Sequence, residues 1–360
     1  MLSKRDPNSK PRLVLVGDVA TETADPSKVF DLISPYIRSS AIAFANCEWP
    51  LSDKGQPWPG KAGRVVKSRP DLVTTYTIPG FNVVCLANNH LMNFGDDGML
   101  QTIEVLDKAG IAHCGGGKNI DEAHKPALLT WKGLRFAFLS YTSVFTPGME
   151  AAENKTGMAV IKIDSHYRIP TRLHEVPGNP LTCDTKAKPS HLERMSVDID
   201  QAKKIADIVI VSMHWGVSMG YQHLVGYQIE IGHAAIDAGA DLIVGHHPHT
   251  IQPIEIYKGK TIAYSLAHCG FDMNSHTFAD ESIVLEMEIK STGLGRTLVR
   301  PIADPIKRPR IVDLQEGAST IEWLRRLSKP FGTKFTDEED YVVAEFEPKL
   351  IQNKVHYSDM

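Results

Sequence analysis

The chain alternates short apolar runs with longer segments whose apolar residues recur at helical spacing. A short continuous apolar run predicts a buried strand, and apolar residues that recur once per helical turn predict an amphipathic helix. The predicted strands occupy residues 12–16, 41–45, 81–87, 111–114, 127–130, 134–141, 208–213, 242–244, 251–257, 261–266, 282–289 and 298–301. The predicted helices occupy residues 25–39, 99–108, 197–206, 226–238 and 320–328. Strands and helices that alternate in this order predict an α/β fold.

Residue types that commonly bind metal follow five of the predicted strands. They are Asp18, Glu48, Asn89 with His90, His214, and His247 with His249. In open α/β folds, sites form outside the carboxyl ends of the strands, so we expect these side chains to converge. Each type also has a structural interpretation, since a carboxylate caps helices, an asparagine adopts left-handed turns and a lone histidine is often a satisfied polar residue. Their recurrence at five strand ends favours a binding site over chance.

The densest group follows residues 242–244, where His246, His247 and His249 lie within four positions. Three imidazoles without a metal would repel one another on protonation, whereas neutral imidazole is a common ligand of transition metals. Pro248 restricts the backbone between His247 and His249 and holds their rings apart. With oxygen ligands and no thiolate, the set suits Zn, Mn or Fe(II), and a bridging carboxylate would allow two divalent ions.

Composition places the chain among ordinary globular proteins. Of its 360 residues, 42% are hydrophobic and 23% are charged, and the formal net charge is −4. Because the chain contains no long run of Lys or Arg, we expect no nucleic-acid partner. The start of the chain is polar and lacks a signal sequence, and no apolar run is long enough to span a membrane, so we expect a cytoplasmic protein without a membrane partner. Five cysteines without a CxxC pair favour free thiols in a reducing compartment.

We expect one large domain at residues 12–305, with an N-terminal extension at 1–11 and a C-terminal extension at 306–360 that packs on the domain. Two insertions are expected to lie over the site. Residues 51–80 begin with a loop rich in Gly, Pro and Lys, whose cations either contact an anionic substrate or are solvated. These cations are Lys61, Arg64, Lys67 and Arg69. Residues 142–196 largely lack periodicity, and we interpret them as an irregular wall or lid.

Five motifs occur in an order that is typical of a known family. They are Gly17-Asp18, Asn46-Cys47-Glu48-Trp49-Pro50-Leu51, Leu86-Ala87-Asn88-Asn89-His90, His214-Trp215-Gly216, and Asp237-Ala238-Gly239-Ala240-Asp241 through His247-Pro248-His249. Over residues 12–290 the chain resembles the CapA family, proteins of the poly-γ-glutamate capsule synthesis type within the calcineurin-like metallophosphoesterases. The resemblance implies a four-layer αββα metallophosphoesterase-like sandwich, with a metal centre at one edge of two packed sheets.

The resemblance also implies roles for the residues that match the family's motifs. The implied metal ligands are Asp18, Glu48, Asn89, His214, His247 and His249, with Glu48 in the bridging position. His90 matches the histidine that assists the leaving group or steadies the transition state. His246 lies at a position that the family pattern does not fix, so we do not expect it to bind metal.

The chain departs from the wider pattern at two places. Asp18 is followed by Val19 and Ala20, where the superfamily usually has Asp-x-His, so one metal position lacks its imidazole. Residues 265–269 read Ser-Leu-Ala-His-Cys where the family commonly has Ser-Leu-Gly-Asn-Phe. His268 is therefore an added ligand, a substrate contact or a structural residue. Further candidates for substrate contact or extra ligation are Asn88, Trp215, Tyr221 and His223.

Together these implications lead to a metal-dependent hydrolase that acts on an amide or γ-glutamyl-type bond, or on a phosphoester, of a peptide or small molecule. A metal in the same site would also acidify a Cα–H beside a carbonyl, so an epimerase of peptides or amino acids is an alternative. A third hypothesis is a non-catalytic subunit of poly-γ-glutamate synthesis. The two insertions contain no motif that selects among these substrates, and the sequence leaves the oligomeric state open.

Overall fold

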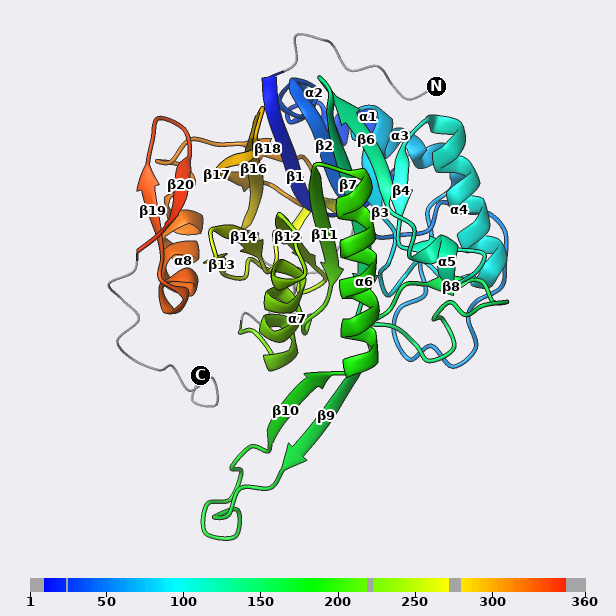
Figure 1. The fold of residues 1–360 in the computed structure, drawn as a ribbon, viewed down its shortest axis with the longest axis vertical. Coiled ribbons are helices and arrows are strands. Elements are labelled where there is room, and N and C mark those ends of the chain that lie inside the picture. The colour runs from blue at the N-terminus through cyan, green and yellow to red at the C-terminus, as the bar shows by residue number, and fades with distance from the viewer. Residues whose placement is uncertain (1–9, 24, 219–222, 272–279, 348–360) are drawn as a thin grey trace.

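Two β-sheets packed face to face, with helices on their outer faces, form the body of the molecule (Figure 1). The computed structural model describes residues 10–23, 25–218, 223–271 and 280–347. Separate apolar clusters fill the space between the sheets and the space under each helical layer. The layers therefore follow the order α, β, β, α, and the predicted α/β sandwich is confirmed.

The first sheet is ten-stranded, with the first strand of the chain near its centre and the next three continuing to one edge. Its strands are β1 (Lys10–Ala20), β2 (Ser40–Cys47), β3 (Val83–Cys85), β4 (Ala112–Cys114), β15 (His268–Phe271), β16 (Ser282–Lys290), β17 (Gly293–Ala303), β18 (Arg310–Ile311), β19 (Thr333–Asp337) and β20 (Val342–Phe346). The continuous path is β19-β20-β17-β16-β1-β2-β3-β4, while β15 pairs with β1 and β18 with β17. Because β1 to β4 and β15 are parallel, their carboxyl ends lie at one edge of the sheet.

The second sheet is six-stranded and is parallel in its middle. Its strands are β6 (Ala127–Trp131), β7 (Leu134–Thr142), β11 (Ile208–His214), β12 (Leu242–His246), β13 (Ile254–Tyr257) and β14 (Lys260–Ala263). They follow the order β13-β14-β12-β11-β7-β6, in which β7, β11, β12 and β14 are parallel and the two outer strands are antiparallel. The predicted hairpins at residues 127–141 and 251–266 correspond to β6–β7 and β13–β14.

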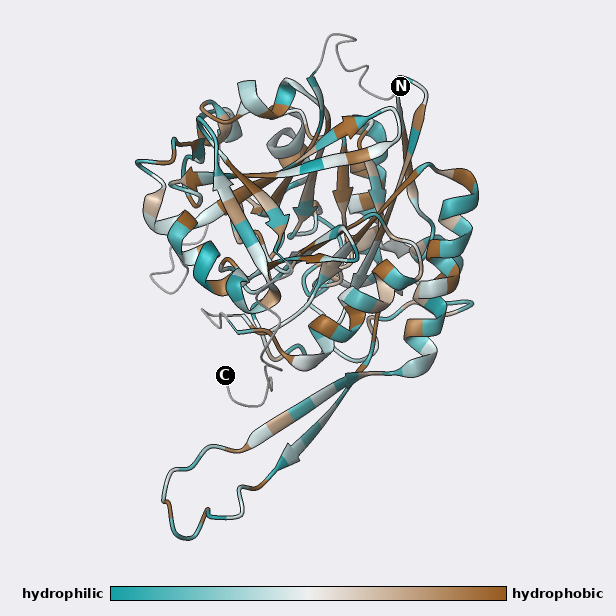
Figure 2. Ribbon diagram, turned by 60° about the vertical axis from the view of Figure 1, so that its left-hand side comes forward, coloured by the Kyte–Doolittle hydropathy of each residue, from teal (hydrophilic) through white to brown (hydrophobic). Residues whose placement is uncertain are grey.

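Aromatic side chains join the two sheets at the centre of the core. The ring of Phe44 on β2 stacks on the ring of Phe138 on β7 with 5.7 Å between centroids, and both side chains are fully buried. Apolar residues alternate along β1, so that Leu13 and Leu15 face the other sheet while Val14 and Val16 face the helices. Figure 2 shows the resulting pattern, with apolar strands inside and polar positions on the outer faces of the helices.

The helices cover the outer faces of the sheets, except the last, whose Ile321 and Leu324 join the core between the sheets. They are α1 (Pro26–Phe30), α2 (Ser34–Arg38), α3 (Thr74–Thr77), α4 (Gly95–Ala109), α5 (Ile120–Ala123), α6 (Pro189–Ile205), α7 (Gly226–Asp237) and α8 (Ala318–Ser328). Helices α2 and α4 pack on the first sheet, and α6 and α7 pack on the second. The prediction of one continuous helix at residues 25–39 is wrong. Pro35, in the first turn of α2, has no N–H to continue the hydrogen-bond ladder of α1, so the chain forms two short helices.

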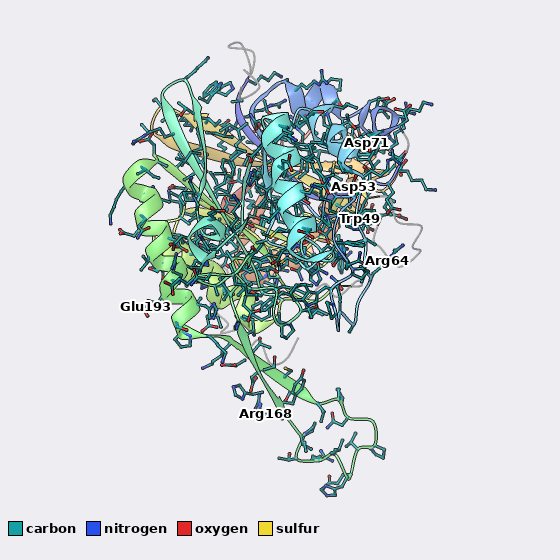
Figure 3. The ribbon with its side chains drawn as sticks, turned by 90° about the vertical axis from the view of Figure 1, so that its right-hand side faces the viewer. Trp49, Asp53, Arg64, Asp71, Arg168 and Glu193 are labelled. Atoms are coloured by element: carbon teal, nitrogen blue, oxygen red, sulfur yellow. The ribbon has the colours of Figure 1, made fainter. Side chains whose placement is uncertain are left out.

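Residues 142–196 are more regular than the sequence predicts. They contain β8 (Gly157–Met158), which pairs with β5 (Gly116–Gly117), the hairpin of β9 (Ile163–Arg168) and β10 (Thr182–Ala187), and the first turns of α6. The β9–β10 hairpin projects from the body of the molecule (Figures 1 and 2), and Figure 3 shows Arg168 on this projection. The expectation of an irregular segment is therefore wrong. The polar residues of β9 and β10 do not give the apolar pattern that predicts a strand.

The chain after residue 309 forms more of the sheet than its sequence pattern indicates. The predicted helix at 320–328 is α8, which packs against β13 and β19. The acidic stretch at 337–340 is the turn between β19 and β20, two strands that extend the first sheet and that the sequence analysis missed. Their charged residues face outward, which obscures the apolar positions. None of the described helices is both long and apolar enough to cross a membrane.

We expect Phe138→Ala to lower the free energy of unfolding by about 3–5 kcal/mol, because it leaves a cavity where the two sheets meet. Leu128→Ala, on the partner strand of the same hairpin, is the matched control. Leu128 is 47% exposed, so its truncation should change the free energy of unfolding by less than about 0.5 kcal/mol. Urea unfolding followed by circular dichroism measures both values, and equal losses in the two variants would contradict the assigned core.

Candidate metal centre

The carboxyl edges of the two sheets meet at one cluster of polar side chains. Asp18 on β1 lies in register with Asn46 on β2, and His214 on β11 lies in register with His246 on β12. Across the gap between the sheets, His214 Nδ1 lies 3.4 Å from Asn46 Nδ2, and His246 Nδ1 lies 3.4 Å from Asp18 Oδ1. Strand ends that are far apart in the sequence are therefore in direct contact.

Two buried carboxylates form the centre of this cluster. Asp18 and Glu48 are fully buried, and the amide of Asn46 donates to Asp18 Oδ1 at 2.7 Å and to Glu48 Oε2 at 2.6 Å. Ligand atoms of Asp18, Glu48 and His214 all lie within 4.8 Å of one another. Three side chains of this kind at such distances form a group that can hold a metal ion.

The environment of the two carboxylates shifts their pKa values in opposite directions. Burial raises the pKa of Asp18, but His246 and His249 outweigh this effect and hold that pKa well below its usual value. Burial, followed by the negative charge of Asp18, raises the pKa of Glu48 well above its usual value. A cation between the two groups would favour the ionised form of both.

Asn89 and His214 form the second pair of candidate ligands. His214 Nε2 lies 2.9 Å from Asn89 Oδ1, a distance that suits a hydrogen bond from the ring N–H to the amide oxygen. Two atoms bound to one divalent cation at about 2.1 Å each would lie at a comparable separation. Burial lowers the pKa of His214 well below its usual value, so the ring is neutral and able to bind metal.

His247 and His249 adopt positive φ angles of 96° and 55°. Such angles cost a residue with a side chain about 1–3 kcal/mol and are concentrated at functional sites. They turn the backbone so that the N–H of His247 donates to Asp18 Oδ2 at 3.2 Å. His249 Nδ1 lies 3.2 Å from the same oxygen, and His249 Nε2 lies 3.8 Å from Glu48 Oε1. Burial lowers the pKa of His247 to about 3, which keeps its ring neutral.

His90 faces the cluster from the turn after β3. Asn93 Oδ1 accepts from the amine of Lys61, so the Asn93 amide nitrogen is directed to Val66 O at 2.9 Å and His90 Nδ1 at 3.0 Å. The other ring nitrogen, Nε2, faces the cluster and lies 3.4 Å from Asn89 Nδ2 and 3.9 Å from Glu48 Oε1. Burial, followed by the charge of Lys61, lowers the pKa of His90 well below its usual value.

Unpaired buried atoms provide a test of whether a cation fits. Glu48 Oε1 and His247 Nδ1 are buried without a hydrogen-bond partner among the described residues. Such groups cost free energy unless a ligand satisfies them, and two buried carboxylates surrounded by neutral imidazoles lack a compensating positive charge. A divalent cation would satisfy both requirements, so the donor set fits a metal centre.

Four of the other candidate contact residues lie in the described part of the chain. Asn88 is buried, and its side chain forms hydrogen bonds with the backbone. It donates to Cys47 O and accepts from the N–H groups of His90 and Leu91. Trp215 is fully buried and its Nε1 donates to Tyr264 O at 2.8 Å, so it packs beneath the cluster and does not face a substrate.

His268 and His223 occupy different surroundings. His268 is buried on β15 in register with Asp18, and its ring centroid lies 5.9 Å from that of His249, so it borders the cluster. His223 is exposed, and its backbone carbonyl accepts from Gln252 at 3.3 Å. Tyr221 lies outside the described residues.

Two members of the cluster are not among the ligands that the resemblance implies. Asn46 is the donor that links both carboxylates, and the alternation of side chains along the extended chain places it on the same side as Glu48. His246, which we did not expect to bind metal, contacts Asp18 directly. The same alternation identifies it, because Leu242, Val244 and His246 share the face of β12 that points to the other sheet. At the departure from Asp-x-His, Ala20 is buried with Trp49 and Phe271.

Comparison with known proteins identifies a matching family. The profile of the family described as "Bacterial capsule synthesis protein PGA_cap" matches residues 12–273. The chain is 30% identical over 283 residues to the PGA biosynthesis protein CapA of Bacillus subtilis (strain 168), covering 78% of this chain and 66% of that protein. It is 28% identical over 310 residues to the capsule biosynthesis protein CapA of Bacillus anthracis, covering 83% and 69%. The chain thus spans about two thirds of the length of these relatives.

Two further matches, one relative and one solved structure, have lower sequence identity to this chain. A probable polyglutamine synthesis accessory protein of Mycobacterium tuberculosis (strain ATCC 25618 / H37Rv) is 27% identical over 289 residues, covering 76% of this chain and 69% of that protein. Among solved structures, a hypothetical protein from Thermus thermophilus aligns with a TM-score of 0.46 and 14% identity, over 82% of this chain and 100% of that one.

We expect the purified protein to retain a divalent ion and His214→Ala to lower the affinity for that ion at least tenfold, because the variant removes a buried donor between the two sheets. His174→Ala is the matched control, since the side chain of His174 is 77% exposed. Elemental analysis after dialysis against graded concentrations of Mn²⁺ or Zn²⁺ measures the affinities. Equal metal retention by the two variants would argue against a cation at this cluster.

Proposed function

Because this chain belongs to the family of bacterial capsule synthesis proteins, we propose that it is a metal-dependent hydrolase of a γ-glutamyl-type amide bond. The observation that carries the proposal is the convergence of Asp18, Glu48 and His214, with ligand atoms within 4.8 Å of one another, beside Nε2 of His90. Two of the relatives described above have names that refer to capsule or PGA biosynthesis, which favours a γ-linked amide over other substrates. A phosphoester is the other bond that the same chemistry would cleave.

We assign the binding of two divalent ions, Mn, Zn or Fe, to six residues: Asp18, Glu48, Asn89, His214, His247 and His249. Glu48 suits a bridging role, since Oε2 accepts from Asn46 while Oε1 has no hydrogen-bond partner in the described part of the chain. When bound, such ions supply Lewis acidity, which makes water a nucleophile at neutral pH and offsets the charge that develops on the attacked carbonyl.

The protein's own residues position His90. Lys61 donates to Asn93, the Asn93 amide contacts His90 Nδ1, and His90 Nε2 thereby faces the carboxylate cluster. In this arrangement His90 Nε2 is placed to contact the nitrogen that leaves when an amide is cleaved and to steady the transition state. Lys61 also donates to the backbone carbonyl of Asn89, so one cation holds both His90 and a candidate ligand in place.

Two other activities follow from the same cluster and are distinguished by experiment. An epimerase would exchange the substrate's Cα–H with solvent deuterium without cleaving any bond. A non-catalytic accessory protein, as the name of the M. tuberculosis relative suggests for that protein, would function in the cell without the His90 side chain. If the cluster activates water for hydrolysis, we expect the substrate to be cleaved and function in the cell to require the His90 side chain.

We expect the metal-loaded protein to hydrolyse γ-glutamyl peptides, and chelation followed by Mn²⁺ or Zn²⁺ to abolish and restore the activity. A parallel panel of phosphoesters identifies the bond that is cleaved. His90→Gln should lower kcat about 10²- to 10³-fold, because it removes the ring that steadies the transition state without removing a metal ligand. His174→Gln, at an exposed position, is the control and should match the wild type.

Full activity in the protein stripped of metal would contradict the proposed function. Wild-type kcat in His90→Gln, with unchanged metal content, would contradict the role assigned to His90. Incorporation of solvent deuterium into the substrate without cleavage would indicate an epimerase instead of a hydrolase.

A further inference from the structure

A second candidate binding site lies at the opposite end of β1 from the metal centre. It is a surface pocket of about 430 Å³ where α2, β17, β18 and the turn between β19 and β20 meet the start of β1. Its lining residues are Lys10, Arg12, Tyr36, Ser39, Arg300, Ile311, Val312, Asp313 and Asp340. Lys10 and Asp18 are eight residues apart on one extended strand, so about 26 Å of backbone separates the pocket from the metal centre.

Three cationic side chains from two strands face this pocket. Arg12 is buried, with its side chain 8% exposed, and Arg300 is 13% exposed. Lys10 is exposed and forms no ion pair with the residues that the structure describes. The three cationic side chains are held near one another although they repel. Guanidinium groups in particular match the geometry of carboxylate and phosphate.

The nearby carboxylates are occupied by other donors. Glu286 Oε2 accepts from Arg12 Nη1 at 2.9 Å and from the hydroxyl of Tyr36, and Arg300 Nε lies 3.9 Å from it. Asp313 Oδ1 accepts from the backbone N–H groups of residues 315 and 316. Asp340 is 65% exposed, and its Oδ2 lies 3.9 Å from Arg300 Nη1. Three carboxylates therefore lie near the three cations, and of these cations Lys10 alone forms no ion pair within the described residues.

Two buried donors of the pocket lack acceptors. The Nε atoms of Arg12 and Arg300 are buried without a hydrogen-bond partner among the residues described. Arg12 is fixed in place, because its guanidinium donates to Tyr36 O and Ser39 Oγ and its Cζ lies 4.2 Å from the centroid of the Tyr36 ring. Buried donors left unsatisfied cost free energy that an oxyanion would recover, whereas Ile311 and Val312 add an apolar wall for the rest of a small molecule.

We propose that this pocket binds a small molecule through a carboxylate or phosphate group. Arg12 and Arg300 present buried donors to the oxyanion, and Lys10 contributes a further charge from the rim. The site is separate from the metal centre. Arg300, residues 311–313 and Asp340 lie outside residues 12–273, the part of the chain that matches the family profile.

Isothermal titration calorimetry of the metal-loaded full-length protein tests the proposal, with inorganic phosphate and succinate as separate probes. At least one probe should bind saturably, and the probe that binds tells which oxyanion the pocket accepts. Lys10→Gln and Arg300→Gln should each weaken this binding at least tenfold, because each removes a charged donor. Their metal content should remain that of the wild type. Lys290→Gln, which removes a 57% exposed cation from neighbouring β16, is the matched control and should bind as the wild type does.

The metal centre is a second place where phosphate can bind, and the variants separate the two sites. Binding that is equal in Lys10→Gln, Lys290→Gln and the wild type would overturn the proposal, as would the absence of saturable binding of both probes. Arg300 packs between Tyr36 and Tyr341, so its substitution risks the fold. Lys10 is exposed, and its variant decides the question even where Arg300→Gln does not fold.

Discussion

Two carboxylates buried side by side impose the main constraint on this structure. Removing an ionised carboxylate from water costs several kcal/mol unless hydrogen bonds or a cation compensate it, and Asp18 and Glu48 are both fully buried. Asn46 donates to both, and the backbone N–H of His247 donates to Asp18. These donors reduce the cost without removing the repulsion between the two charges. The requirement for a positive charge at this point explains why neutral imidazoles and an amide oxygen also converge there.

Some residues around the carboxylates adopt backbone conformations that cost folding free energy but direct donor atoms at the cluster. His247 and His249 retain positive φ angles that a glycine would adopt at lower cost, and the turn they form directs one backbone donor and two rings at the cluster. The ring of His90 is also held in place, because Lys61 donates to Asn93 and the Asn93 amide contacts His90 Nδ1. Strain and a partly buried lysine are both unfavourable for folding, so their occurrence beside the same carboxylates points to a functional role.

Strand β1 connects the two polar centres of the molecule. Its carboxyl end contributes Asp18 to the carboxylate cluster, and its first residues contribute Lys10 and Arg12 to the pocket. Between these ends the strand is an uninterrupted apolar core element, packed by Leu13 and Leu15 on one face and Val14 and Val16 on the other. A rigid central strand holds both sites at a fixed separation.

The amino-acid sequence by itself determined the α/β class, most of the strands and the residues at their carboxyl ends, because strand period and residue chemistry are local properties. It did not reveal that Asn46 links the carboxylates, since that depends on the side-chain geometry of neighbouring strands, or that His246 reaches Asp18, since that contact crosses between the two sheets. It also left Trp215 as a candidate for substrate contact, although packing against Tyr264 buries it. Only the tertiary structure decided these points, and it alone brought Arg300 from β17 beside Arg12 of β1. The physical reason is that burial and contact between distant strands depend on how the sheets pack, which no local pattern encodes.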